Sequence, residues 1–199
     1  MKKVSKVSAV LALCVSAVLG VANPAFAQQT ASVDKPTLEV GQTWTFARTD
    51  LWKNQVTRRR VQTVTEVLSG AYTVQYRDNG GQAVGTIELT DQLDEHKIDG
   101  QKSGFMRPVV FPLSVGKTWE STAGLGGLST KQKCKVEAFE PVTVKAGTFS
   151  AYKIVCPGSY NNSGNSGSTM TVRYYAPEIG RPIRIEFSDR TPSGTVWNN

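Results

Sequence analysis

The chain has 199 residues, of which 39% are hydrophobic and 20% charged, with a formal net charge of +7. Three lysines lie in the first six positions, so the remainder carries 20 basic against 16 acidic residues, a net charge of about +4. A chain of this length can bury a core without a metal or cofactor, and we expect none. The modest positive charge, together with the export signal described next, argues against nucleic acid as a partner.

The first 27 residues form a predicted signal peptide of the bacterial Sec type. Lys2, Lys3 and Lys6 precede an apolar run of about 15 residues, too short for a membrane-spanning helix. Ala25-Phe26-Ala27 is a small-x-small cleavage pattern, so we expect cleavage after Ala27. Residues 28–199 should then form a single β domain that is periplasmic or secreted and not an integral membrane protein.

Strand patterns dominate the first half of the chain. Residues rich in valine, threonine and aromatic side chains predict strands at 42–48, 56–67, 72–77 and 83–90. The segment 50–55 is a predicted hairpin tip, and Asp78-Asn79-Gly80-Gly81 is typical of a tight primed turn. The polar segment 91–103 predicts a loop or one helical turn, and 105–113, with two prolines, at best an edge strand.

The second half repeats this character. Strands are predicted around 131–139, 152–156, 170–175 and 183–187, where Met170, Val172 and Tyr174 alternate with Thr171, Arg173 and Tyr175. The glycine-rich segment 123–129 predicts a hairpin loop, and the Gly/Ser/Asn-rich segment 158–168 a mobile loop. The sequence therefore predicts an all-β protein, an antiparallel meander that forms an open barrel or a strongly curved sheet.

A short motif occurs twice. Leu38-x-Val40-Gly41-x-Thr43-Trp44 recurs 75 residues later as Leu113-x-Val115-Gly116-x-Thr118-Trp119. We interpret this as a weak repeat with halves near 36–110 and 111–190, with one core tryptophan in each half. A chance recurrence of a common strand opening is the alternative.

Cys134 and Cys156 remain after signal cleavage, and an exported protein favours a disulfide between them. A two-residue turn at Ala146-Gly147 would place Cys156 opposite Glu137 instead. The bond therefore requires a bulge near Pro141 or pairing between strands that are not neighbours.

The segment from Val142 to Ile154, with Ala146-Gly147-Thr148-Phe149 at its centre, is followed by Tyr174-Tyr175-Ala176-Pro177-Glu178-Ile179-Gly180. These two segments resemble an exported bacterial all-β family of unknown function with V-x-A-G-T-F-x-A-Y and Y-A-P-x-x-G motifs. The resemblance covers about a quarter of the chain and implies an antiparallel β fold similar to the open barrels of periplasmic lipoprotein carriers. It transfers no catalytic residues.

Catalytic constellations are scarce in the sequence. The single histidine, His96, lies in a charged segment, and two cysteines with one distant histidine fall short of a zinc site. Acidic residues of 91–103 (Asp91, Asp94, Glu95 and Asp99) could serve a hydrolase, but a solvated loop is the simpler interpretation. We predict no catalytic residue, no metal ligand and no enzymatic activity.

Three residues are the best candidates for a ligand or partner contact. Trp52 lies beside Leu51 at the predicted hairpin tip, where an exposed tryptophan would contact a partner or a membrane surface. Arg58 and Arg60 share one side of a strand and could bind an anion such as a lipid phosphate. The sequence favours a non-enzymatic periplasmic β module that binds a hydrophobic or cell-envelope ligand. The alternatives are a protein-interaction or structural envelope module without a small ligand, and a hydrolase that uses the acidic segment.

Overall fold

The computed structural model describes residues 32–81, 84–194 and 196–198, with the backbone alone for 103–106 and 196–198. The predicted signal peptide lies outside the described residues. The described part of the chain contains strands, turns and loops and no helix, and so none long and apolar enough to cross a membrane. The predicted all-β class is confirmed.

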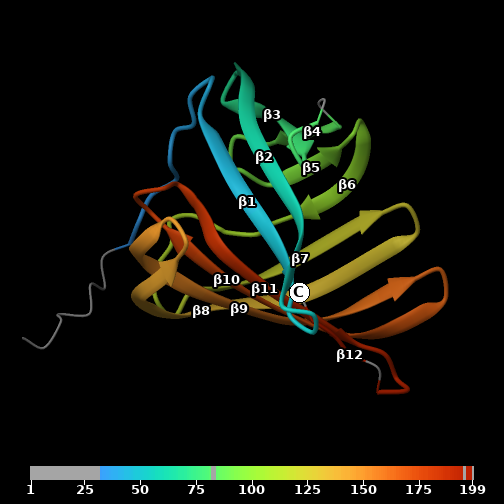
Figure 1. Cartoon of the computed structure of the whole chain (residues 1–199). Coiled ribbons are helices and arrows are strands. Elements are labelled where there is room, and N and C mark those ends of the chain that lie inside the picture. Colours follow the sequence, from blue (N-terminus) through green and yellow to red (C-terminus); the bar gives the residue numbers. More distant parts are fainter. Residues whose placement is uncertain (1–31, 82–83, 195, 199) are drawn as a thin grey trace, which may run out of the picture.

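The first half forms a six-stranded antiparallel sheet whose strands follow each other in chain order (Figure 1). Its strands are β1 (Thr43–Asp50), β2 (Gln55–Leu68), β3 (Ala71–Asp78), β4 (Gly85–Leu89), β5 (Glu95–Ile98) and β6 (Gln101–Met106). The predicted turn at 78–81 is present, with positive φ at Asn79 and Gly80. The loop predicted for 91–103 is present only at residues 91–94, because β5 and β6 pair as a hairpin from Glu95 onward.

The second half forms another six-stranded antiparallel sheet, in the order β12-β11-β10-β9-β8-β7. Its strands are β7 (Thr118–Leu125), β8 (Leu128–Val144), β9 (Gly147–Asn162), β10 (Asn165–Ala176), β11 (Arg181–Arg190) and β12 (Val196–Asn198). The two sheets do not join into a closed barrel within the described residues. Segment 107–117 connects them, so the edge strand proposed for 105–113 is wrong beyond Met106.

The two copies of the repeated motif adopt the same local structure. Gly41 and Gly116 have φ of 91° and 90°, which favours glycine at both positions. The amide of Gly41 donates to Val64 O at 2.8 Å, and that of Gly116 donates to Val136 O at 2.9 Å. Each motif thus ties the start of its sheet to a fully buried valine on the second strand.

Each sheet has its own apolar core. Leu38 and Val64 belong to the core of the first sheet, against which Trp44 packs. Leu113 and Val136 occupy the matching places in the second core, against which Trp119 packs. The predicted role of Trp44 and Trp119 as one core tryptophan per half is confirmed.

The predicted mobile loop at 158–168 is wrong. β9 and β10 run through it and are joined by a tight turn at Ser163-Gly164. A side chain at Gly167 would collide with the backbone oxygen of Arg190 and approach the ring of Tyr160 to 2.7 Å. The glycine-rich composition therefore reflects close packing between strands rather than mobility.

The predicted disulfide between Cys134 and Cys156 is present, with the two Cα atoms 4.1 Å apart on neighbouring strands β8 and β9. The β8–β9 turn pairs Val144 with Gly147, one residue earlier than the turn considered above. A bulge between Val136 and Ala138 shifts the β8–β9 register by one further residue and brings the two cysteines opposite each other. The expected bulge exists, but it precedes Pro141 rather than adjoining it.

Candidate functional site

The hairpin formed by β1 and β2 extends beyond the rest of its sheet. β3 accompanies β2 only as far as the pair Arg60–Asp78, and Asn79 after it still bonds to the backbone of Arg59. Residues 48–59, here called the hairpin arm, otherwise form a ribbon of two strands without a third. Figure 1 shows β1 and β2 running side by side away from β3 to β6. Every residue from 51 to 59 is exposed.

The tip of the hairpin arm presents two large apolar side chains to solvent. Trp52 is 74% exposed and Leu51 is 59% exposed. The Asp50 carboxylate holds the turn, because its Oδ1 accepts hydrogen bonds from the amides of Trp52 at 2.9 Å and Lys53 at 3.1 Å. The predicted tip is therefore confirmed, and its tryptophan is displayed by an ordered turn.

The two candidate arginines have different surroundings. Arg60 donates from Nε and Nη2 to both oxygens of Asp78, at 2.8 and 3.0 Å, and its guanidinium lies 3.9 Å from the centre of the Tyr76 ring. These hydrogen bonds hold the pKa of Asp78 below its ordinary value. Arg58 lies farther from Asp78, at 3.5 Å, and its side chain is 46% exposed. Arg58 is thus better placed than Arg60 to meet an external anion.

The acidic residues of 91–103 do not gather into one site. Asp94 forms an ion pair with Arg107 at 3.3 Å. Asp99 accepts hydrogen bonds from the Tyr76 hydroxyl at 2.7 Å and from the amide of Thr86 at 2.8 Å. His96 faces Glu88 at 3.5 Å. Among the described residues, no group of three or more His, Cys, Asp or Glu side chains could hold a metal ion.

Sequence reasoning missed a group of charges between the two sheets. Arg173 on β10 and Arg181 at the start of β11, here called the inter-sheet arginines, belong to the second sheet. Both act electrostatically on Glu95 of β5 in the first sheet. Arg181 also donates from Nη2 to Gln62 Oε1 at 2.6 Å and lies 4.9 Å from the centre of the Trp44 ring.

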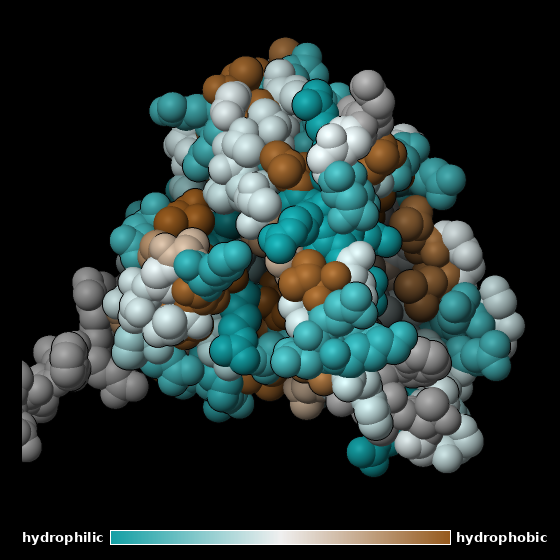
Figure 2. Space-filling view, in the orientation of Figure 1, coloured by the Kyte–Doolittle hydropathy of each residue, from teal (hydrophilic) through white to brown (hydrophobic). Residues whose placement is uncertain are grey.

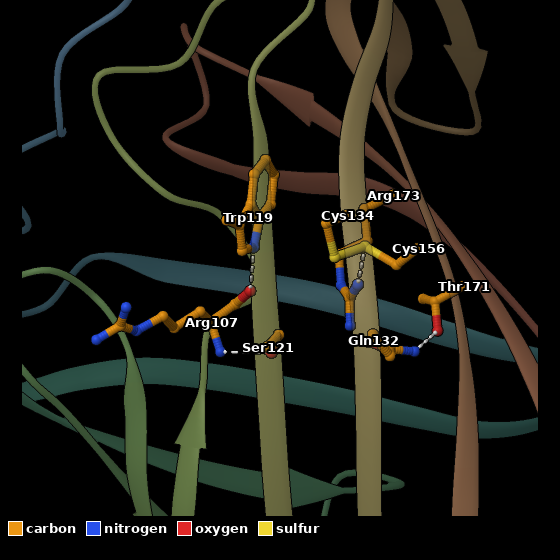
Figure 3. Close-up of a disulfide and its surroundings, with 8 residues drawn as sticks. All are labelled: Arg107, Trp119, Ser121, Gln132, Cys134, Cys156, Thr171 and Arg173. Carbon is orange, nitrogen blue, oxygen red and sulfur yellow. Dashed lines mark hydrogen bonds between the residues drawn. A yellow bond between two sulfur atoms is a disulfide. The ribbon is translucent and has the colours of Figure 1, made fainter.

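The surroundings of Arg173 are unusual for a charged group. Arg173 is only 8% exposed, and its Nη1 donates a hydrogen bond to the sulfur of Cys156 at 3.5 Å (Figure 3). Register explains this position, because Arg173 lies opposite Ile154 and Thr171 lies opposite Cys156. Thr171, Arg173 and Tyr175 are therefore the buried face of β10, while Met170 is 39% exposed.

Burial raises the pKa of Glu95 above its ordinary value, and the charges of Arg181 and Arg173 offset part of that rise. Burial lowers the pKa of both inter-sheet arginines, which Glu95 partly offsets. A guanidinium remains charged at physiological pH even so. The space between the sheets therefore holds permanent positive charge.

A shallow polar groove lies at the far ends of β8, β9 and β10. Its lining consists of Ser129, Lys131, Ser159, Tyr160, Asn161, Ser166 and Gly167. Figure 2 shows mostly hydrophilic residues on the face in view, with small hydrophobic patches rather than one continuous apolar surface. Neither feature resembles the apolar cavity that a hydrophobic ligand would need.

Comparison with known proteins places the chain near one solved structure. No protein-family model and no curated protein matches the sequence. The chain is similar to a protein from Bacteroides fragilis that is described as exported and as having a YmcC-like fold. The TM-score is 0.46 and the identity 13%, over 84% of this chain and 96% of that one. The family resemblance drawn from the 142–154 and 174–180 segments stays a prediction.

Proposed function

We propose that this protein is a non-enzymatic β module of the bacterial cell envelope that docks its hairpin arm onto an anionic lipid surface. The observation that carries the proposal is the 74% exposure of Trp52 at the end of a ribbon that no third strand supports. Tryptophan favours the membrane–water interface, where its ring is shielded from water and its N–H stays hydrogen-bonded.

The apolar tip supplies attraction to a lipid surface. Burying about 150 Å² of the Trp52 ring at about 25 cal/mol per Å² is worth up to about 4 kcal/mol. Leu51, exposed beside it, adds to this. The ordered turn reduces the conformational entropy lost on contact, because the hydrogen bonds to Asp50 already fix it.

The charges on the hairpin arm favour an anionic surface over a neutral one. Lys53, Arg58 and Arg59 are exposed within seven residues of one another. Each basic side chain near an anionic bilayer contributes about 1 kcal/mol. Asp50 opposes this, although its carboxylate is engaged by the turn amides. The arm therefore combines an apolar and a basic signal, and two such signals are what stable attachment to a membrane surface usually requires.

The other two functions considered from the sequence receive less support. An apolar ligand between the sheets would meet Arg173, Arg181 and Glu95, and charged groups there weigh against it. A hydrolase would need a paired acid and base, whereas Asp94 and Asp99 are each engaged by structural partners.

Co-sedimentation with vesicles tests the proposal. The mature protein should bind phosphatidylglycerol-containing vesicles and bind pure phosphatidylcholine vesicles at least tenfold more weakly. Trp52→Ala should weaken binding by about tenfold or more. Leu128→Ala, at the β7–β8 turn where Leu128 is 40% exposed, is the matched control and should bind normally. Binding that is absent, or equal for Trp52→Ala and Leu128→Ala, would overturn the proposal, as would capture by an envelope protein without vesicle binding.

A further inference from the structure

Among the described side chains, neither the buried Arg173 nor the partly buried Arg181 has the carboxylate partner in an ion pair that such guanidinium groups usually have. None of the ion pairs among the described side chains includes Arg173 or Arg181. Arg173 has a sulfur as its hydrogen-bond acceptor, at 3.5 Å. Arg181 donates from Nη2 to Gln62, and its buried Nε has no hydrogen-bond partner among the residues that the structure describes. One buried guanidinium nitrogen thus has no acceptor among the described residues, and another has only a sulfur, which is a weak acceptor.

The local charge is also unbalanced. Glu95 is the acidic group that acts on both inter-sheet arginines, so two positive charges face at most one negative charge. Tyr175 does not supply another, because burial raises its pKa far above the ordinary value and keeps the phenol neutral. Arg60 is already neutralised by Asp78. An excess positive charge in a buried place is costly unless an anion compensates it.

We propose that the space between the two sheets binds a phosphate group, held by Arg173 and Arg181. The planar guanidinium forks suit a tetrahedral oxyanion, which offers several oxygens to donors that approach from different strands. The Gln62 amide stands beside Arg181 and has N–H donors of its own. The phosphate could be inorganic phosphate or the head of an envelope phospholipid. This site is separate from the hairpin arm and does not depend on membrane docking there.

Glu95 sets the strength of this site. Its carboxylate repels a bound phosphate and competes with it for the same two arginines. Removing that charge without changing the size of the side chain should therefore tighten phosphate binding. A purely structural role for the two arginines, as ties between the sheets, predicts no binding and no such increase.

Calorimetric titration of the mature protein with inorganic phosphate, at constant ionic strength set by chloride, tests the proposal. We expect saturable binding to the wild type, tighter binding by at least threefold in Glu95→Gln, and a loss of tenfold or more in Arg173→Gln and Arg181→Gln. Arg184→Gln is the matched control, because Arg184 lies on β11 but is 51% exposed and stacks on Tyr174. It should bind phosphate normally.

A soluble short-chain phosphatidic acid, titrated in parallel below its micellar concentration, identifies the source of the phosphate. Tighter binding than inorganic phosphate supports a phospholipid head, and equal binding supports the free ion. No saturable binding by either probe to the wild type and Glu95→Gln, or an equal loss in Arg184→Gln, would overturn the proposal. The wild type and Glu95→Gln test phosphate binding even where an arginine variant fails to fold.

Discussion

At the scale of single residues, the same amino acid serves different purposes according to its neighbours. Arg58 and Arg60 look equivalent in the sequence, but Asp78 engages Arg60 through both of its oxygens and leaves Arg58 more exposed. The sequence showed that the two arginines share one side of a strand. It could not show which of them meets the carboxylate, because Asp78 comes from the next strand and its register decides the pairing.

Glu95 gives a prediction for the pH dependence of stability. Burial raises its pKa in the folded protein above the unfolded value, near 4.5. Its contribution to the free energy of unfolding is therefore fully present below pH about 4.5 and is lost as the pH rises through the folded pKa. The charged groups that face it, Arg60, Arg173 and Arg181, stay protonated throughout this range.

The stability of Glu95→Gln relative to the wild type should consequently rise as the pH increases from about 4.5 to 7, because only the wild type must then carry a charged carboxylate in this place. Urea unfolding of both proteins between pH 4.5 and 7.5 measures this difference. A difference that does not vary with pH, or that falls as the pH increases, would contradict the burial of this carboxylate.

At the scale of strands and turns, hydrophobic alternation predicted where the strands lie better than which face they bury. The strands near 42–48, 56–67 and 72–77 are all present. On β10, however, hydropathy favours burial of Met170 and Val172, whereas the structure buries Thr171 and Arg173. The unbroken pairing of β10 with the disulfide strand β9 fixes that face, since it places Arg173 opposite Ile154 and Thr171 opposite Cys156. That pairing begins at the turn Ser163-Gly164, which hydropathy does not reveal.

The glycine-rich composition of 158–168 predicted a mobile loop, whereas the structure has two closely packed strands there. A substitution at Gly167 distinguishes these two interpretations. Gly167→Ala should destabilise the protein by about 1–3 kcal/mol, because the added carbon would collide with the Arg190 backbone and the Tyr160 ring. Gly124→Ala, on β7, is the matched control, because its added carbon would meet the nearest atom at an ordinary 3.6 Å. Thermal denaturation compares the two. A neutral Gly167→Ala would restore the mobile-loop interpretation.

At the scale of the whole molecule, β1 to β6 lie within the predicted half near 36–110 and β7 to β11 within the half near 111–190, while β12 lies beyond it. A shared turn at Gly41 and Gly116 begins each sheet, and the sequence motif predicted this correspondence. Common ancestry of the halves stays a prediction. The packing of one sheet against the other could not be predicted, because Glu95, Gln62, Arg173 and Arg181 lie on separate strands with no shared motif.

The disulfide lies within the second half, yet we expect the halves to unfold together as a single domain. Replacing both Cys134 and Cys156 by serine should cost about 3 kcal/mol, since the bond closes a loop across a sequence separation of 22. For a protein of this size, that loss corresponds to a fall in Tm of about 6–12 °C. For each protein, far-ultraviolet circular dichroism and tryptophan fluorescence should give the same unfolding midpoint as each other. Two separate transitions would show that the halves are independent domains.

Hydrogen exchange of the mature protein with and without phosphatidylglycerol vesicles tests most directly whether the hairpin arm contacts a membrane. Apart from Arg59, the hairpin arm pairs only within itself, so its amides should exchange faster in solution than those of strands with neighbours on both sides. Docking predicts slower exchange confined to residues 48–59, centred on Trp52 and absent with phosphatidylcholine vesicles. Unchanged exchange at 48–59, or protection centred on another part of either sheet, would contradict the assignment of this hairpin as the membrane-contacting element.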